Sequence, residues 1–186
     1  MYSIEIMVDE HRKISRMLKV MRTAAFQILQ GQDLDFEDFA DMIDFVRQYA
    51  DAHHHGKEEK ILFVEVQNRL GELGKNLVTH GMLVEHDWGR LFISELIQAL
   101  ERLKKGEEKA KLDIIANAVG YAAHLERHIA KEDTVAYPFA ERSLPAEVLA
   151  EVDEKTRIFE AKAQEKNIQE YYEKMLLRLE EKYQDE

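Results

Sequence analysis

Apolar residues recur along most of the chain at alternating spacings of three and four, which is the pattern of amphipathic α-helices. The first such series runs over residues 3–30. Three more helices are predicted over 36–70, 76–105 and 109–142, with short glycine-containing turns between them. Four long helices joined by short turns predict an all-α fold, an antiparallel up-and-down four-helix bundle.

A fifth amphipathic segment follows the fourth helix, and Pro145 suits its first helical turn. Its outer positions are dense in Glu and Lys, it contains no histidine, and nothing in it favours catalysis. We therefore predict a bundle over residues 1–142 and an appended C-terminal helix over 143–186. This helix is expected to pack on the bundle, or to pair with a second copy of the chain or a partner protein.

One histidine lies at the centre of the apolar stripe on each of the four bundle helices. These histidines are His11, His55, His86 and His128. In the second and fourth helices a glutamate, Glu59 or Glu132, follows four residues later on the same helical face. A buried charge is costly unless something compensates it. We therefore expect these four imidazoles and two carboxylates to converge on metal inside the bundle.

The second helix carries three adjacent histidines, which point in directions about 100° apart. The stripe through His55 and Glu59 is otherwise apolar, whereas the stripe through His54 and Glu58 contains further charged residues. We therefore place His55 and Glu59 at the metal. His53, His54 and Glu58 are expected at the edge of the apolar stripe or in solvent.

Composition narrows the chemistry of this site. The absence of cysteine excludes disulfides, thiolate ligands and iron–sulfur clusters, so histidines and carboxylates must hold any metal. Six such ligands exceed what one zinc ion needs, whereas two carboxylates between imidazoles suit a pair of octahedral ions such as iron or manganese. Because imidazole-rich ligation favours iron over manganese, we expect two iron ions.

Charge and hydropathy limit the partners. A net charge of −11 without a basic stripe argues against nucleic acid as a partner. No apolar run approaches the roughly 20 residues of a membrane span, and the first residues lack the basic and apolar regions of a signal peptide. We therefore expect a cytoplasmic protein with neither nucleic-acid nor membrane partners.

Four sequence elements resemble the hemerythrin-like (HHE cation-binding) family over about residues 1–142. They are the Glu-His pairs at 10–11 and 85–86, the segment HHGKEEKILF from His54, and the segment HIAKED from His128. The resemblance implies a four-helix bundle around a non-haem di-iron centre that binds dioxygen. In that family two carboxylates and an oxo or hydroxo group bridge the two ions.

The match to the oxygen-carrying members is incomplete. Their third helix has His-x-x-x-His, but the second of these positions is Arg90 here, and Glu132 stands where they have Asp. The pattern is more similar to the bacterial hemerythrin-like branch, whose roles include oxygen, nitric oxide or redox sensing and iron handling. The vacant ligand position is then filled by His124 or water, or stays open. An inward Arg90 would pair with a carboxylate or an iron-bound anion.

We therefore expect a di-iron protein that binds dioxygen or nitric oxide, with no catalytic residues of its own, rather than an enzyme. His124, His54, Glu58 and Arg90 are candidates for additional ligands or for groups beside the ligands. One alternative is a ferritin-like oxidase or peroxidase, which requires more carboxylates than imidazoles. Another is a structural or signalling bundle whose polar cluster binds zinc or nothing.

Overall fold

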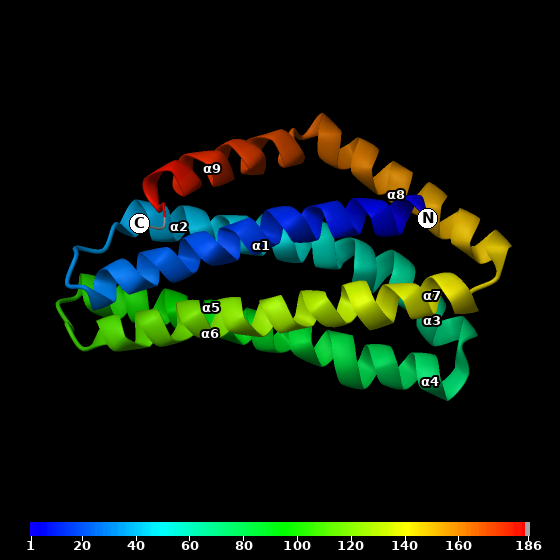
Figure 1. Cartoon of the computed structure of the whole chain (residues 1–186), viewed down its shortest axis with the longest axis horizontal. Helices are drawn as coiled ribbons and strands as arrows, with labels where there is room; N and C mark the ends of the chain where they lie inside the picture. The colour runs from blue at the N-terminus through cyan, green and yellow to red at the C-terminus, as the bar shows by residue number, and fades with distance from the viewer. Residues whose placement is uncertain (185–186) are drawn as a thin grey trace.

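The computed structural model describes residues 1–184, within which every regular element is helical (Figure 1). In chain order the helices are α1 (Tyr2–Leu29), α2 (Phe36–Asp44), η1 (Phe45–His55), η2 (Glu58–Leu62), α3 (Phe63–Arg69), α4 (Gly71–Lys75), η3 (Asn76–Met82), α5 (Leu83–Lys104), α6 (Ala110–Lys131), η4 (Glu132–Ala136), α7 (Tyr137–Ser143), α8 (Ala146–Glu165) and α9 (Ile168–Lys182). The η segments are π-helical, with hydrogen bonds between residues five apart. None of the described helices combines the length and the apolar character that crossing a membrane requires.

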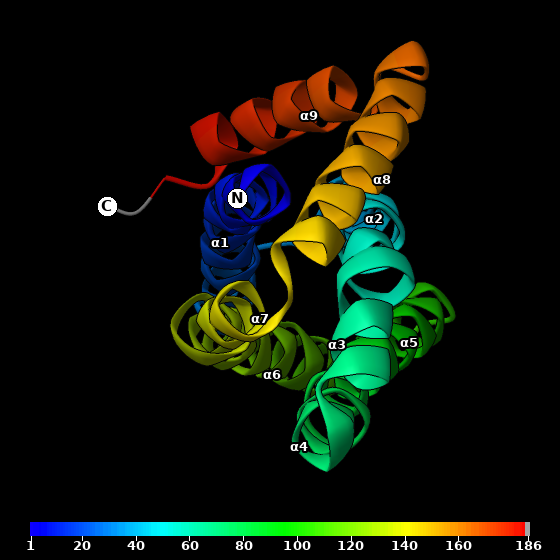
Figure 2. The same ribbon diagram turned by 90° about the vertical axis from the view of Figure 1, so that its right-hand side faces the viewer.

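The bundle part of the chain forms four long helical rods. The first rod is α1, the second runs from α2 to α3, the third from α4 to α5, and the fourth from α6 to α7. Figures 1 and 2 show the rods side by side around a common axis, and α1 packs on α6, and α6 on α5. The bounds of the rods agree with the predicted helices, except that the third rod begins at Gly71 rather than at residue 76.

The C-terminal segment is two helices, so the prediction of a single appended helix is wrong. The chain turns between α8 and α9 at Asn167, whose φ of 54° lies in the left-handed region that asparagine tolerates better than most residues. This turn lets the segment follow the bundle surface: α8 lies against α1 and η2, and α9 against α1 and η1 (Figure 2). The segment therefore forms a strap over the first and second rods.

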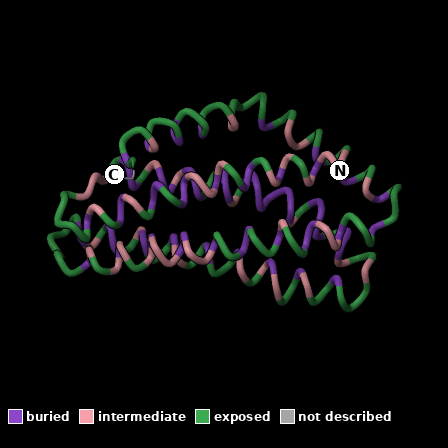
Figure 3. Tube along the Cα trace, in the orientation of Figure 1, coloured by how far each residue is buried: buried purple, intermediate pink, exposed green. Residues whose placement is uncertain are grey.

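Buried residues line the inner faces of the rods, while the outer faces are exposed (Figure 3). The buried apolar side chains form two clusters, one containing Ile14 and Leu125 and the other containing Met7 and Ala136. On the first three rods, buried polar residues lie in the sequence between members of the two clusters, and on the fourth rod Glu132 lies between Ile129 and Ala136. On α1, for example, Glu10 and His11 separate Met7 from Ile14, so polar side chains gather in a band with apolar packing on both sides.

Candidate metal centre

Seven buried side chains of this band form two adjacent groups. The three-histidine group consists of His55, His86 and His128. The four-residue group consists of His11, His54, Glu58 and Glu132. Within each group, one ligand atom from every residue lies within 4.8 Å of the others. All four rods contribute, so the site exists only in the assembled bundle.

The two glutamates of the four-residue group also face the three-histidine group. Glu132 places Oε2 at 3.2 Å from His11 Nε2 and Oε1 at 3.1 Å from His128 Nε2. Glu58 Oε2 lies 3.7 Å from His54 Nε2 and 3.5 Å from His86 Nε2. Each carboxylate thus faces a histidine of both groups, which is the placement required of a carboxylate that bridges two ions.

Each of the five histidines has its own carboxylate partner at Nδ1. The pairs are His11 with Asp133 at 2.7 Å, His54 with Glu10 at 2.8 Å, His55 with Asp51 at 3.2 Å, His86 with Glu59 at 2.7 Å, and His128 with Glu85 at 2.9 Å. A carboxylate only accepts, so Nδ1 carries the proton in each neutral ring and donates it. The Nε2 lone pair of each ring is then free for a metal, as in carboxylate–histidine–metal triads.

The site fits a metal because most of its inward atoms have no other partner. The buried atoms without a hydrogen bond include His54 Nε2, His86 Nε2, His128 Nε2, Glu58 Oε2 and both carboxylate oxygens of Glu132. Leaving one such group unpaired costs about 1–3 kcal/mol. Imidazole nitrogens and carboxylate oxygens are the donor set of iron, manganese and zinc. A metal ion satisfies these atoms together.

The electrostatics of the two groups favour the metal-binding form at some of these side chains and oppose it at others. Burial lowers the pKa of His54 to about 4 and the pKa of His55 well below its ordinary value, so both rings stay neutral, the form that binds metal. Burial also lowers the pKa of His11 and of His86, but hydrogen bonds with carboxylates raise both overall, that of His11 to about 9, so metal would have to displace a proton from His11.

Burial raises the pKa of Glu58, and the neighbouring carboxylate of Glu132 raises it further. Burial opposes ionisation of Glu132 too, but His128 and His11 bring its pKa below the ordinary range. Bound metal would displace the proton from Glu58.

The structure brings together five of the six predicted ligands, His11, His55, His86, His128 and Glu132, but not the sixth. Glu59 lies outside the buried groups, where its carboxylate accepts from His86 Nδ1 and from Arg90. Glu58 takes the place predicted for Glu59, and His54 joins the four-residue group. The prediction that His53, His54 and Glu58 lie at an edge or in solvent is wrong, because they are 4, 1 and 0 % exposed.

Two physical features of the second rod caused this error. Its hydrogen bonds join residues five apart over η1 and η2, so the 100° step from which the inward face was chosen does not apply. The rod is also covered on several sides. His53 contacts Phe159 of α8, His54 contacts His11 of α1, and His55 stacks on His86 of α5 with ring centroids 3.8 Å apart.

Of the candidates for the position that Arg90 leaves vacant, His124 lies outside both buried groups. His124 instead donates from Nε2 to the backbone carbonyl of Glu85, at 2.8 Å. Arg90 pairs with Asp51, Glu59 and Asp87, which agrees with the predicted alternative of a carboxylate partner.

Sequence reasoning missed Tyr137, a buried residue beside the four-residue group. Its hydroxyl donates to Glu58 Oε1 at 2.6 Å, and its ring stacks on His11. Burial, together with the charge of Glu58, holds the tyrosine pKa well above its usual value, so the hydroxyl keeps its proton. Tyr137 follows Glu132 by five residues, a spacing that the π-helical segment η4 brings to one side.

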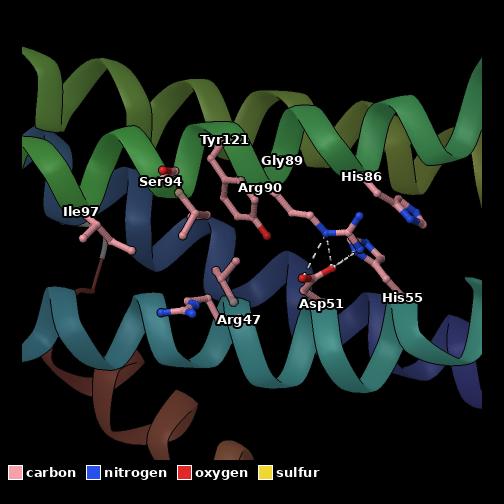
Figure 4. Close-up of a pocket in the computed structure, with 11 residues that line it drawn as sticks. Arg47, Asp51, His55, His86, Gly89, Arg90, Ser94, Ile97 and Tyr121 are labelled. Atoms are coloured by element: carbon pink, nitrogen blue, oxygen red, sulfur yellow. Dashed lines mark hydrogen bonds and ion pairs between the residues drawn. The ribbon is translucent and has the colours of Figure 1, made fainter.

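A cavity of about 360 Å³ between the second and third rods reaches the three-histidine group (Figure 4). His55 and His86 line it, together with the apolar side chains Val46, Ile93 and Ile97 and the polar residues Arg47, Asp51, Arg90, Ser94 and Tyr121. Figure 4 shows the ion pair of Arg90 and Asp51 beside His55. The cavity gives a small molecule room next to two of the inward imidazoles.

The family model described as the hemerythrin HHE cation-binding domain matches residues 2–140. This match includes all seven residues of the two buried groups and leaves α8 and α9 outside. No curated protein and no solved structure matched the chain.

Proposed function

Because the chain belongs to the hemerythrin HHE cation-binding family, we propose that its four rods are an antiparallel four-helix bundle holding two iron ions. The unpaired, inward-facing nitrogen and oxygen atoms of the two buried groups carry this proposal. The three-histidine group would hold one ion, and His11 and His54 the other. Glu58 and Glu132 face histidines of both groups and would be shared.

We propose that the ligand of this centre is dioxygen or a related diatomic such as nitric oxide, in sensing, storage or iron handling. A ferrous pair would supply the electrons for binding such a molecule. Five histidines against two glutamates distinguish the donor set from the carboxylate-rich set expected of a ferritin-like oxidase. The cavity beside His55 and His86 suits entry of a small uncharged molecule.

The protein's own residues prepare the site for this task. The five carboxylates at Nδ1 fix the orientation and tautomer of the histidines before metal arrives. Tyr137 holds one oxygen of Glu58 in place, so the other points toward the histidines. The apolar clusters pack on both sides of the centre and limit its contact with water. The cytoplasmic location and the division near residue 142 remain part of the proposal.

Spectroscopy on the iron-loaded full chain tests this function. The protein is reduced without oxygen, dioxygen or nitric oxide is admitted, and the visible absorption spectrum is recorded before and after the gas is removed. We expect a ligand-dependent band that disappears when the gas is removed. Sustained consumption of hydrogen peroxide would favour the oxidase or peroxidase alternative, and a spectrum unchanged by either gas would contradict the proposal.

A further inference from the structure

Helix α8 buries a lysine that belongs to the metal-binding rods. Lys57 of the second rod is 1 % exposed, and its ammonium contacts both Glu10 of α1 and Glu160 of α8. Glu160 lies beyond the family match and is itself largely buried. A buried charge must be paired, so α8 contributes half of the charge that compensates Lys57.

This ion pair continues to a residue of the metal centre. Glu10 holds Lys57 through Oε1 and accepts from His54 Nδ1 through Oε2, at 2.8 Å. The opposite ring nitrogen, His54 Nε2, faces the four-residue group without a partner. Three successive contacts therefore connect α8 to a metal-facing nitrogen: Glu160 to Lys57, Lys57 to Glu10, and Glu10 to His54.

The cluster of Glu10, His53 and Glu160 has ligand types that suit a third metal ion. The ammonium of Lys57 is already there, in contact with both carboxylates and 3.1 Å from His53 Nε2. This cluster is therefore an ion-pair network that ends at the metal centre, and Lys57 is its cation.

The fourth rod contains the same arrangement without α8, which shows what α8 adds. Lys131 contacts Glu85, and the other oxygen of Glu85 accepts from His128 Nδ1 at 2.9 Å. Lys131 directly precedes Glu132, just as Lys57 directly precedes Glu58. The side chain of Lys131 is 53 % exposed and has no second carboxylate partner in residues 1–184, whereas Lys57 is enclosed and has Glu160.

We propose that Glu160 is a positioning residue for the metal centre, acting on His54 through Lys57 and Glu10, so that docking of α8 and metal binding are linked. Glu160 compensates part of the positive charge of Lys57. Glu10 therefore keeps more of its negative charge and is a stronger hydrogen-bond acceptor for His54. A stronger carboxylate partner makes the imidazole a better metal donor. By thermodynamic linkage, if docked α8 raises the affinity for metal, then bound metal stabilises the docking of α8 by the same free energy. The inference rests on the metal site proposed above.

Cobalt titration of the metal-free full chain tests this link. Cobalt(II) is followed by its visible absorption in the wild type, in Glu160→Gln, and in the matched control Asp153→Asn. Asp153 also lies on α8 and accepts from the backbone and hydroxyl of Ser3 at 2.9 and 2.7 Å, but it does not contact Lys57. We expect Glu160→Gln to weaken cobalt binding about tenfold, the low end for residues beyond the ligands. The control should stay within about twofold.

A second readout uses the wild type and does not depend on the folding of a variant. Amide hydrogen exchange of α8 is measured with and without cobalt, and helix α4, which is distant from Glu160 in the sequence, serves as reference. Cobalt should slow amide exchange in α8, and the factor by which it does so should be about the factor by which α8 docking raises the affinity for cobalt. Glu160→Gln should abolish this metal effect, whereas Asp153→Asn should keep it.

The outcomes separate the failure of the link from the failure of the site. Equal cobalt affinity in Glu160→Gln and the wild type, or equal losses in Glu160→Gln and Asp153→Asn, would overturn the link while leaving the metal site standing. If amide exchange in α8 were the same with and without cobalt, this result would also overturn the link while leaving the metal site standing. A wild-type chain that binds no cobalt would overturn the metal site and the link with it.

Discussion

His54 and Glu10 are 44 positions apart in the sequence, and a hydrogen bond of 2.8 Å joins them beside the metal centre. The next residue after Glu10, His11, belongs to the four-residue group, so this Glu-His pair contributes one hydrogen-bond acceptor behind a histidine and one candidate ligand. In the second Glu-His pair, likewise, Glu85 accepts a hydrogen bond from His128 and His86 belongs to the three-histidine group. The repeated dipeptide thus links neighbouring rods in a two-fold pattern.

The substitution Glu58→Gln should remove metal, whereas Glu59→Gln should not. Glu58 faces histidines of both groups, but Glu59 only supports His86 from outside. We expect Glu58→Gln to lose at least one of two ions per chain. Glu59→Gln should keep both, with affinity lowered about tenfold as for other residues behind a ligand. Metal analysis of the dialysed proteins measures this difference, and the reverse order would contradict the assignment of ligands.

The substitution Arg90→Ala should speed ligand entry without removing metal. Arg90 and Asp51 form an ion pair where the cavity meets His55, so truncating Arg90 widens the path. We expect the air oxidation rate of the reduced iron form to rise severalfold. Arg47→Ala is the control, because Arg47 lines the same cavity and has no ion pair within residues 1–184. Stopped-flow absorption gives both rates, and equal rates in the two variants would count against a gating role.

The substitution Tyr137→Phe should destabilise the metal-free protein. It removes the donor to Glu58 Oε1 and leaves a buried oxygen unpaired, which costs about 1–3 kcal/mol. Tyr121→Phe provides the matched control, because the Tyr121 hydroxyl has no hydrogen bond within the described part of the chain. Urea unfolding of both variants measures the free energies. A loss as large in Tyr121→Phe would show that the hydrogen bond to Glu58 is not the cause.

The substitution Asp38→Asn should reduce stability more near pH 7 than near pH 2. Burial opposes ionisation of Asp38, yet hydrogen bonds from Lys182, Arg178 and Tyr183 of the C-terminal strap bring its pKa below the ordinary value. A depressed folded-state pKa stabilises the fold above the unfolded value, about 3.9, and this contribution is lost as pH falls through the folded value.

Urea unfolding at the two pH values measures the effect of Asp38→Asn, and we expect a loss of roughly 1–3 kcal/mol at pH 7. Asp33→Asn is the control, because Asp33 is exposed in the loop before α2 and has no ion pair within residues 1–184. A pH-independent loss in Asp38→Asn would assign its role to packing instead of charge.

Periodicity and the repeated motifs were sufficient to predict the rods, the family and most of the inward histidines. His11, His86 and His128 are the polar members of apolar helical stripes, and burial of one face explains them. The family match confirms the resemblance over residues 2–140. These features depend on local sequence, which is why a single chain reveals them.

The inward-facing residues of the second rod could not be predicted from the sequence pattern of that rod alone. His54 and Glu58 are buried because η1 and η2 are π-helical and because neighbouring helices cover several sides of the rod. One signal was present in the repeat itself. Aligning the pair Glu58-Glu59 with Glu132-Asp133 places His54 opposite His128, one position before His55.

The strap also depends on tertiary contacts. Its amphipathic pattern continues through Asn167, where the left-handed turn separates α8 from α9. Its docking relies on single charged residues such as Glu160 and Arg178, whose partners lie more than 100 positions away. No local pattern identifies these pairs.

Iron content per chain tests the central claim most directly. Protein from iron-supplied cells is quantified by amino-acid analysis and its metals by mass spectrometry, with the visible spectrum recorded on the same sample. Two iron ions per chain, reduced to one or none in Glu58→Gln, is the result that we predict. A chain that carries only zinc or no metal, or iron that Glu58→Gln does not affect, would contradict the assignment of these residues to a di-iron centre.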